Sequence, residues 1–224
     1  MKVLLFDIDG TLLRAYGAGS EAMRRAAEAV LGERCRGAQI DLGGALDPWI
    51  FERLAAHGGY EIDDAIHARF RPLYAQLLVE HLERPDSRCA AMPGVHKLLA
   101  HLRQAKNATM GLLTGNYKET GAVKLRKAGI EVEQFEIAAW GDMAKTRPGL
   151  VPVAVSQLTR RVEPRDVIVI GDTVRDVHAA HENGAMCVAV TTGGSTRNQL
   201  EEAGADVVLD DLDDLELVIK HLTE

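Results

Sequence analysis

A series of short apolar runs, separated by helix-like segments, restricts the fold of this sequence more than any other feature. The runs are three to six residues long and do not alternate with polar residues, which predicts strands covered on both faces, as in a parallel sheet. Aromatic residues make up only 4% of the chain, while Ala, Leu and Val are plentiful, a balance that favours helices packed on a β-branched sheet. We therefore predict an α/β fold of repeated strand–helix units. The predicted strands are Val3–Phe6, Ala108–Leu113, Phe135–Trp140, Val167–Ile170, Met186–Val190 and Val207–Leu209.

Residues 14–88 interrupt this rhythm, because helical periodicity replaces the strand pattern there. Helices are predicted over 22–31, from the Asp47-Pro48 cap pair onward, and over 63–81. Pro72 is expected to kink or divide the third helix. An insert of this length, placed directly after the first strand, is sufficient for a small helical bundle.

Cap patterns mark the starts of later helices. Asn116 stands three residues before Glu119, and Thr196 stands three residues before Gln199. This is the spacing of a capping box, so we expect Asn116 and Thr196 to cap the helices that follow them.

The charge of the chain narrows its range of partners. The net charge is -7 and no basic run is longer than two residues, so we expect neither a nucleic acid nor an anionic membrane as a partner. The three cysteines lie far apart and match no metal-binding or redox spacing. The N-terminal apolar run is too short for a signal-peptide core. We therefore expect a cytoplasmic protein without a membrane span.

Two carboxylates follow the first predicted strand, in the run Phe6-Asp7-Ile8-Asp9-Gly10-Thr11. Residues two apart in a strand face the same way, and open α/β sheets bind ligands at the carboxyl ends of their strands. Asp7 and Asp9 together would require a cation there. Alone, this Asp-x-Asp pattern is a weak signal, because carboxylates at strand ends are common in caps and turns.

A second acidic pair and a hydroxyl follow two other predicted strands. Asp172 stands at the tip of the strand that ends at Ile170, and Asp176 follows one helical turn later. These hard oxygen donors, without a suitable Cys or His set, predict a Mg²⁺ site shared with Asp7. Thr114-Gly115-Asn116 follows a further strand and provides side-chain and backbone donors for phosphate oxygens.

These residues resemble, in order along the whole chain, the four motifs of the haloacid dehalogenase-like hydrolase superfamily, most of whose members are phosphatases. The resemblance implies a Rossmann-like parallel-sheet core, residues 1–14 and 89–224, with an inserted α-helical cap domain, residues 15–88. The arrangement is that of phosphoglycolate phosphatase-like members.

Roles at the matching positions follow from this resemblance. Asp7 would attack phosphorus and form an aspartyl-phosphate, while Asp9 would protonate the leaving alcohol and later activate water. Thr114 would bind the phosphoryl oxygens. Asp172 would bind Mg²⁺ together with the Asp7 carboxylate and the Asp9 main-chain carbonyl, and Asp176 would support the ion directly or through water.

The third motif departs from the usual Lys-Pro of the family, since this chain reads Ala144-Lys145-Thr146-Arg147-Pro148. Arg147 matches the family lysine by its position before proline, and Lys145 matches it by residue type. We favour Arg147, because a guanidinium binds a phosphate and a carboxylate together. Substrate choice is expected to depend on the cap and the crossings that lead to it, which makes Arg14 and Tyr16 candidate substrate-binding residues.

The sequence therefore predicts a Mg²⁺-dependent phosphatase that acts on a small-molecule phosphate ester, as a monomer or a homodimer. A dehalogenase of the same fold generally lacks the second aspartate, so Asp9 argues against it. A phosphonate-cleaving enzyme needs a lysine in the cap, and residues 14–88 contain none. A sugar-phosphate mutase remains an alternative, as does a noncatalytic phosphate-binding or receiver-like module, although a receiver domain needs no helical lid.

Overall fold

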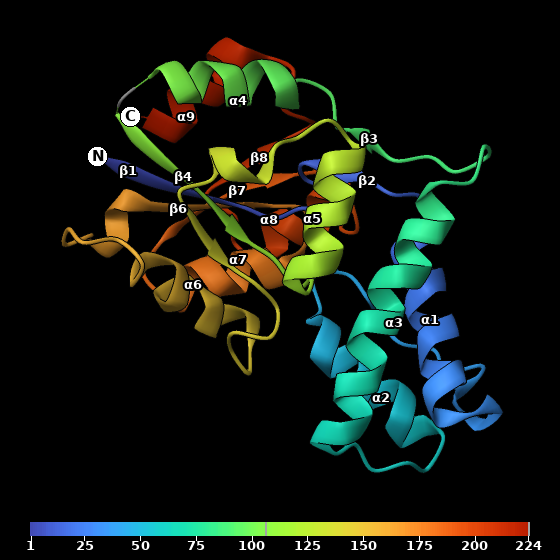
Figure 1. Cartoon of the computed structure of the whole chain (residues 1–224). Helices are drawn as coiled ribbons and strands as arrows, with labels where there is room; N and C mark the ends of the chain where they lie inside the picture. The colour runs from blue at the N-terminus through green and yellow to red at the C-terminus, as the bar shows by residue number, and fades with distance from the viewer. Residues whose placement is uncertain (106, 224) are drawn as a thin grey trace.

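A six-stranded parallel sheet in the order β5-β4-β1-β6-β7-β8 forms the centre of the molecule (Figure 1). The computed structural model describes residues 1–105 and 107–223. The strands of this sheet are β1 (Lys2–Phe6), β4 (Ala108–Leu113), β5 (Ile137–Ala139), β6 (Val167–Gly171), β7 (Met186–Val190) and β8 (Val207–Leu209). The predicted α/β fold is thus confirmed, with β5 shorter than its apolar run.

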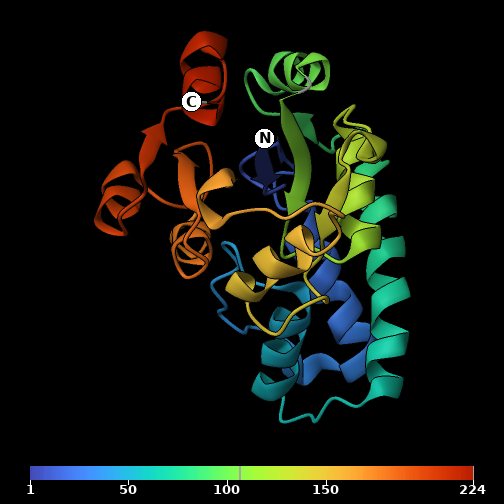
Figure 2. The same cartoon turned by 90° about the vertical axis from the view of Figure 1, so that its left-hand side faces the viewer.

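Helices cover both faces of the sheet, which is why the apolar runs lack alternation (Figures 1 and 2). One face of β1, with Leu4 and Phe6, packs in a core that includes side chains of α4 (Val95–Gln104) and α9 (Leu215–Thr223). The other face, with Val3 and Leu5, packs in a second core with side chains of α6 (Arg147–Val155), α7 (Val174–His181) and α8 (Arg197–Glu202). Each fully buried aliphatic or aromatic side chain contributes roughly 1.5–3 kcal/mol.

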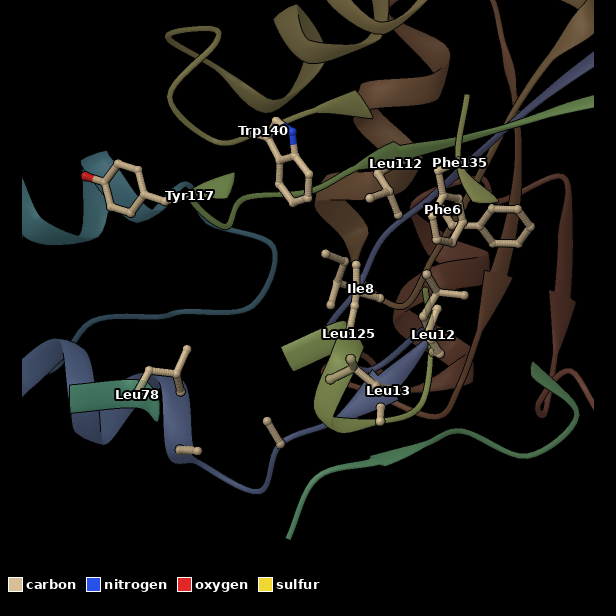
Figure 3. Packing of buried hydrophobic residues seen from close by; sticks show 14 of the residues in the cluster. Phe6, Ile8, Leu12, Leu13, Leu78, Leu112, Tyr117, Leu125, Phe135 and Trp140 are labelled. Carbon is tan, nitrogen blue, oxygen red and sulfur yellow. The ribbon is translucent and has the colours of Figure 1, made fainter. Parts of the chain in front are cut away.

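Figure 3 shows the first of these cores from close by. Phe6 and Phe135 meet edge to face with ring centroids 6.4 Å apart, and Leu112 of β4 lies beside them. Leu125 of α5 (Lys118–Lys127) joins the same core. These contacts hold the ends of β1 and β4 in a fixed position relative to α5. They thereby fix the positions of the polar residues that follow the two strands.

The segment between β1 and β4 contains three long helices that lie to one side of the sheet (Figure 1). They are α1 (Ala18–Leu31), α2 (Asp47–His57) and α3 (Asp64–Leu82). Phe51 and Phe70 stack with ring centroids 3.6 Å apart and hold α2 against α3. The chain enters and leaves this bundle through two short strands, β2 (Leu13–Arg14) and β3 (Ala90–Ala91), which pair antiparallel and which the sequence pattern did not predict.

Pro72 does not divide α3, which continues as one helix through it. The proline removes a hydrogen-bond donor, but the residues around it, including Phe70, Tyr74 and Leu78, are fully buried. Tertiary packing of this apolar face outweighs the local cost of the missing bond. The expected division of the helix is therefore wrong.

Two predicted caps are also wrong, whereas a third is confirmed. Helix α5 begins after Tyr117 without a side-chain cap, and the amide of Asn116 is used elsewhere, as described below. Asp47 is the first residue of α2 and does not cap it, because its carboxylate instead accepts a hydrogen bond from the main-chain N–H of Tyr117 at 2.9 Å. Thr196 and Gln199 form the expected capping box.

Candidate active site

The polar residues that follow β1, β4 and β6 gather at the carboxyl edge of the sheet. The chain runs from β1 to β4 and β5 on one side, and then returns to place β6 on the other side of β1. This reversal of strand order opens a crevice beyond the strand ends, where α/β proteins bind ligands. Asp7, Thr114 and Asp172 all line a pocket of about 440 Å³ at this point.

Three carboxylates form a cluster at the carboxyl edge of the sheet, and two of them, Asp7 and Asp172, line the pocket. One oxygen each of Asp7, Asp172 and Asp176 lies within 4.8 Å of the others, and all three residues are buried. Burial raises the pKa of Asp7 to about 6, and the nearby Asp176 adds to the rise although Arg147 opposes it. Burial also raises the pKa of Asp172 to about 8, reinforced by Asp7 and Asp176. Such crowding of acids favours a cation between them.

Arg147 connects two members of this cluster. Its Nη2 atom lies 3.1 Å from Oδ1 of Asp7 and 2.5 Å from Oδ1 of Asp176. Burial alone would lower the pKa of the guanidinium, but Asp176 and Asp7 raise it, so Arg147 stays charged. Lys145 is exposed and does not belong to the pocket lining. The geometry therefore separates the two candidates that the sequence left open, with Arg147 at the site.

The oxygens of Asp176 are already in use. Oδ1 accepts from Arg147 Nε at 2.9 Å, and Oδ2 accepts from the main-chain N–H and the hydroxyl of Thr173. This is a capping box that starts α7. Asp176 is thus the member of the cluster that fixes Arg147, and it does not line the pocket.

Asp172 is held at the strand tip by two donors. Thr11 Oγ1 donates to its Oδ1 at 3.1 Å, and the Gly194 main-chain N–H donates to its Oδ2 at 2.7 Å. Gly10 turns the chain beside it with a positive φ of 85°, and a Cβ there would lie 2.6 Å from Asp172 Oδ2. Only glycine fits both requirements. Gly194 and its neighbour Gly193 both line the pocket.

Asp9 faces a different set of partners from Asp7. Its Oδ2 atom accepts from Asn116 Nδ2 at 2.8 Å and from Lys124 Nζ at 2.7 Å. Asn116 Nδ2 also donates to Thr114 Oγ1 at 2.8 Å. Asn116 and Thr114 follow β4, so these hydrogen bonds connect Asp9 to the end of that strand.

Lys124 is a residue of this site that sequence reasoning missed. It lies on α5 with 6% of its side chain exposed. A signal was present, since Thr120, Gly121, Leu125 and Ala128 are buried on the same face of the helix. A lysine within such an i, i+3, i+4 stripe indicates a charge held in the interior by a partner.

The two candidate substrate-binding residues lie where the chain crosses into the helical bundle, next to the pocket. Arg14 and Tyr16 both line it, together with Gly115, and both are exposed. The Arg14 guanidinium donates to the carbonyl of Thr192, and it lies 5.9 Å from the centre of the Tyr16 ring. Tyr16 has a positive φ of 46°, a conformation that costs a non-glycine residue about 1 kcal/mol or more.

The helical bundle contributes the rest of the pocket wall. Met23, Leu42, Ile50 and Tyr74 line it. The loop before α2 also contacts the sheet domain directly, since Arg147 Nη1 donates to the Gly44 carbonyl at 3.1 Å and the Asp47 N–H donates to the Gly115 carbonyl at 2.7 Å.

Within residues 1–105 and 107–223, none of the helices combines the length and the apolar composition that crossing a membrane requires.

Two curated phosphatases are similar to this chain in sequence. Phosphoglycolate phosphatase of Synechococcus elongatus is 31% identical over 163 residues, which cover 69% of this chain and 73% of the relative. N-acetylmuramic acid 6-phosphate phosphatase of Pseudomonas aeruginosa is 25% identical over 218 residues, which cover 94% and 91%.

Solved structures share the fold over its full length. A hydrolase from Pseudomonas syringae superposes with a TM-score of 0.74 at 22% identity and covers 100% of both chains. A β-phosphoglucomutase from Clostridium difficile also reaches 0.74, at 20% identity over 99% of this chain and 97% of that one. A family model described as haloacid dehalogenase-like hydrolase matches residues 1–184. This chain therefore belongs to the haloacid dehalogenase-like hydrolase family.

Proposed function

We propose that this protein is a magnesium-dependent phosphatase that hydrolyses a small phosphate monoester through an aspartyl-phosphate on Asp7. The observation that carries the proposal is the placement of Asp7 in the pocket, beside the buried acid Asp172 and in contact with Arg147. The relatives named phosphoglycolate phosphatase and N-acetylmuramic acid 6-phosphate phosphatase support hydrolysis of a small phosphate ester.

The residues present fit a magnesium ion. Asp7 and Asp172 offer hard carboxylate oxygens, and burial gives each carboxyl a raised pKa that a cation would lower again. We assign Asp176 to holding Arg147, since both of its oxygens accept hydrogen bonds. The carboxylate of Asp9 is engaged by Lys124, so Asp9 is assigned to the ion through its main-chain carbonyl. When bound, Mg²⁺ would neutralise charge on the transferred phosphoryl group.

The protein residues supply nucleophile, proton transfer and phosphate binding. An oxygen of Asp7 forms a bond to phosphorus as the ester P–O bond breaks, and Asp9 gives its proton to the leaving alcohol. Asp9 then takes a proton from water, whose oxygen attacks phosphorus and releases phosphate and Asp7. The Thr114 hydroxyl, with the Gly115 and Asn116 segment, and the Arg147 guanidinium bind the phosphoryl oxygens and stabilise their charge.

We further propose that residues 15–88 act as a cap over a core of residues 1–14 and 89–224. The pairing of β2 with β3 at the two crossings and the pocket wall contributed by α1, α2 and α3 support this division. Arg14 and Tyr16 stand at the first crossing, and we assign them to contact with the leaving group.

The test measures phosphate release from an aryl phosphate with and without Mg²⁺, in the wild type and in Asp7→Asn. Asp86→Asn, on an exposed loop, serves as the matched control. The proposal expects magnesium-dependent release in the wild type and in the control, and loss in Asp7→Asn. Persistent activity in Asp7→Asn would exclude Asp7 as nucleophile, and inactivity of all three proteins would favour a noncatalytic phosphate-binding module. A parallel assay with a sugar phosphate distinguishes a mutase, which would isomerise the sugar phosphate without releasing free phosphate.

A further inference from the structure

Lys124 occupies an unusual position for a lysine, because its charged end lies inside the protein next to the proposed acid/base. Its Nζ atom is 2.7 Å from Asp9 Oδ2 and 2.7 Å from Asn116 Oδ1. Burial alone would lower the pKa of its ammonium group, but Asp9 and Asp47 together raise it. Lys124 therefore remains a cation in the interior, and a buried cation needs its partners.

The ammonium group decides which way the Asn116 amide points. Lysine has hydrogen-bond donors and no acceptor, so the atom that faces Nζ must be the amide oxygen of Asn116. The amide nitrogen then points the other way, where its two hydrogens meet Asp9 Oδ2 and Thr114 Oγ1. The accepting oxygen of Asp9 selects the same orientation, so Lys124 and Asp9 together fix the amide from its two ends.

The same chain of bonds orients the hydroxyl of Thr114. Its oxygen accepts from the main-chain N–H of Asn116 at 3.3 Å and from Nδ2 at 2.8 Å. A hydroxyl oxygen has two lone pairs and one hydrogen. Since both lone pairs are occupied, the hydrogen of Thr114 remains available for a phosphoryl oxygen, and Thr114 is one of the residues that line the pocket.

Asp9 is constrained in a related manner. Its Oδ2 atom accepts from both Lys124 and Asn116, and an oxygen in two such bonds is a poor site for a proton. Oδ1, which takes part in neither of these bonds, is therefore the oxygen left for proton transfer. During the first transfer the Oδ1–H bond breaks and the proton joins the leaving oxygen as its bond to phosphorus breaks.

We propose that Lys124 is a positioning residue that directs the Asp9 proton to Oδ1 and, through Asn116, directs the Thr114 hydroxyl hydrogen into the pocket. This inference rests on the proposed phosphatase function. It predicts that Lys124 matters most for substrates whose leaving group needs a proton, because proton transfer to an alkoxide contributes typically 10²–10⁴-fold, whereas a nitrophenolate leaves without one.

The test compares kcat/KM for an alkyl phosphate and for p-nitrophenyl phosphate in the wild type and in Lys124→Met. The expected result is a loss of about 100-fold with the alkyl ester and about tenfold or less with the aryl ester. Lys127→Met, an exposed lysine on the same helix, is the matched control and should leave both values unchanged. Equal losses with both esters would indicate a merely structural role and would overturn the inference.

Two further variants distinguish the proposed effect from a failure of Lys124→Met to fold. Asp47→Asn combined with Lys124→Met also replaces the buried carboxyl that interacts with Lys124, and should show the same drop in the alkyl-to-aryl ratio. Asn116→Ala keeps Lys124 and its charge but removes the bonds to Thr114 and to Asp9 Oδ2. Loss of the Thr114 bond should lower both rates, and loss of the Asp9 bond should also lower the alkyl-to-aryl ratio; an unchanged ratio there contradicts the inference. A wild type that hydrolyses neither ester would instead refute the proposed function, so the two failures are distinguishable.

Discussion

Nη2 of Arg147 lies 3.1 Å from Oδ1 of Asp7, with both side chains almost completely buried. The guanidinium also donates to the Asp176 carboxylate and to the main-chain carbonyl of Gly44. It therefore connects the proposed nucleophile, the start of α7 and the loop that precedes α2. A lysine has too few donors in a fixed planar arrangement to make all these contacts together.

Substitution of Arg147 should accordingly damage both activity and stability. Arg147→Ala leaves Asp7 and Asp176 buried without their cation, and we expect kcat/KM with an aryl phosphate to fall about 100-fold or more. Arg147→Lys should recover part of the loss. Steady-state kinetics and thermal melting check both effects. Lys145→Ala is the control, since that side chain is exposed, and a comparable loss there would return Lys145 to the site.

Magnesium affinity should increase with pH. Burial raises the pKa of Asp7 to about 6 and that of Asp172 to about 8 in the metal-free protein, so protons compete with the cation below these values. Affinity measured by titration calorimetry should strengthen from pH 6 to pH 8, by roughly tenfold per pH unit for each proton released. Asp172→Asn should bind more weakly and with a flatter dependence. A constant affinity across this range would show that the two carboxyls do not hold the ion.

Asp47 should make the folded protein less stable as pH rises. Burial raises its pKa to about 7 from the ordinary value of 3.8, against the opposing effect of Lys124. Between about pH 4 and pH 7 the folded state holds a proton that the unfolded chain has released, so the free energy of unfolding falls with rising pH. The contribution is at most about 4 kcal/mol.

Urea unfolding of the wild type and of Asp47→Asn from pH 4 to pH 8 isolates this effect, because contributions from Asp7 and Asp172 are common to both proteins. The difference in unfolding free energy should shift in favour of the variant as pH rises. Parallel curves would show that Asp47 is ionised in the folded state throughout this range.

Arg14 and Tyr16 should influence which ester is preferred more than how fast the chemistry proceeds. Both line the pocket at the first crossing, and neither belongs to the Asp7 cluster. Alanine at either position should alter relative kcat/KM values across a panel of phosphate esters by about tenfold, as expected when one contact to the leaving group is lost. Thr223→Ala, at the far C-terminal helix, serves as a control. Unchanged relative rates would remove both residues from substrate choice.

Local patterns in the sequence were enough to predict the sheet and the positions of the acids. Continuous apolar runs mark strands buried on both faces, and a carboxylate directly after such a run must lie at the carboxyl edge. Asp7 and Asp172 follow two runs that become the neighbours β1 and β6. Their proximity therefore depends on strand order, which the repeated strand–helix pattern restricts to few arrangements.

Contacts between segments far apart in the chain decided which partners the polar side chains of the site have. Arg147 and Lys145 are two residues apart, and only the packing of α6 against α7 buries one and exposes the other. Asn116 had the spacing of a cap, but Asp9 and Lys124 offered its amide charged partners, which form stronger hydrogen bonds than a helix end does. Asp47 does not cap its own helix, because its carboxylate accepts from the main-chain N–H of Tyr117 just before α5.

The sequence alone thus determined a parallel α/β sheet with carboxylates after two of its strands, because strand burial and strand ends are properties of short segments. Only the tertiary structure decided which basic residue meets Asp7 and that Lys124 holds Asp9. The physical reason is that a buried charge is stable only beside an opposite charge, and its partner here comes from a segment more than 100 residues away in sequence.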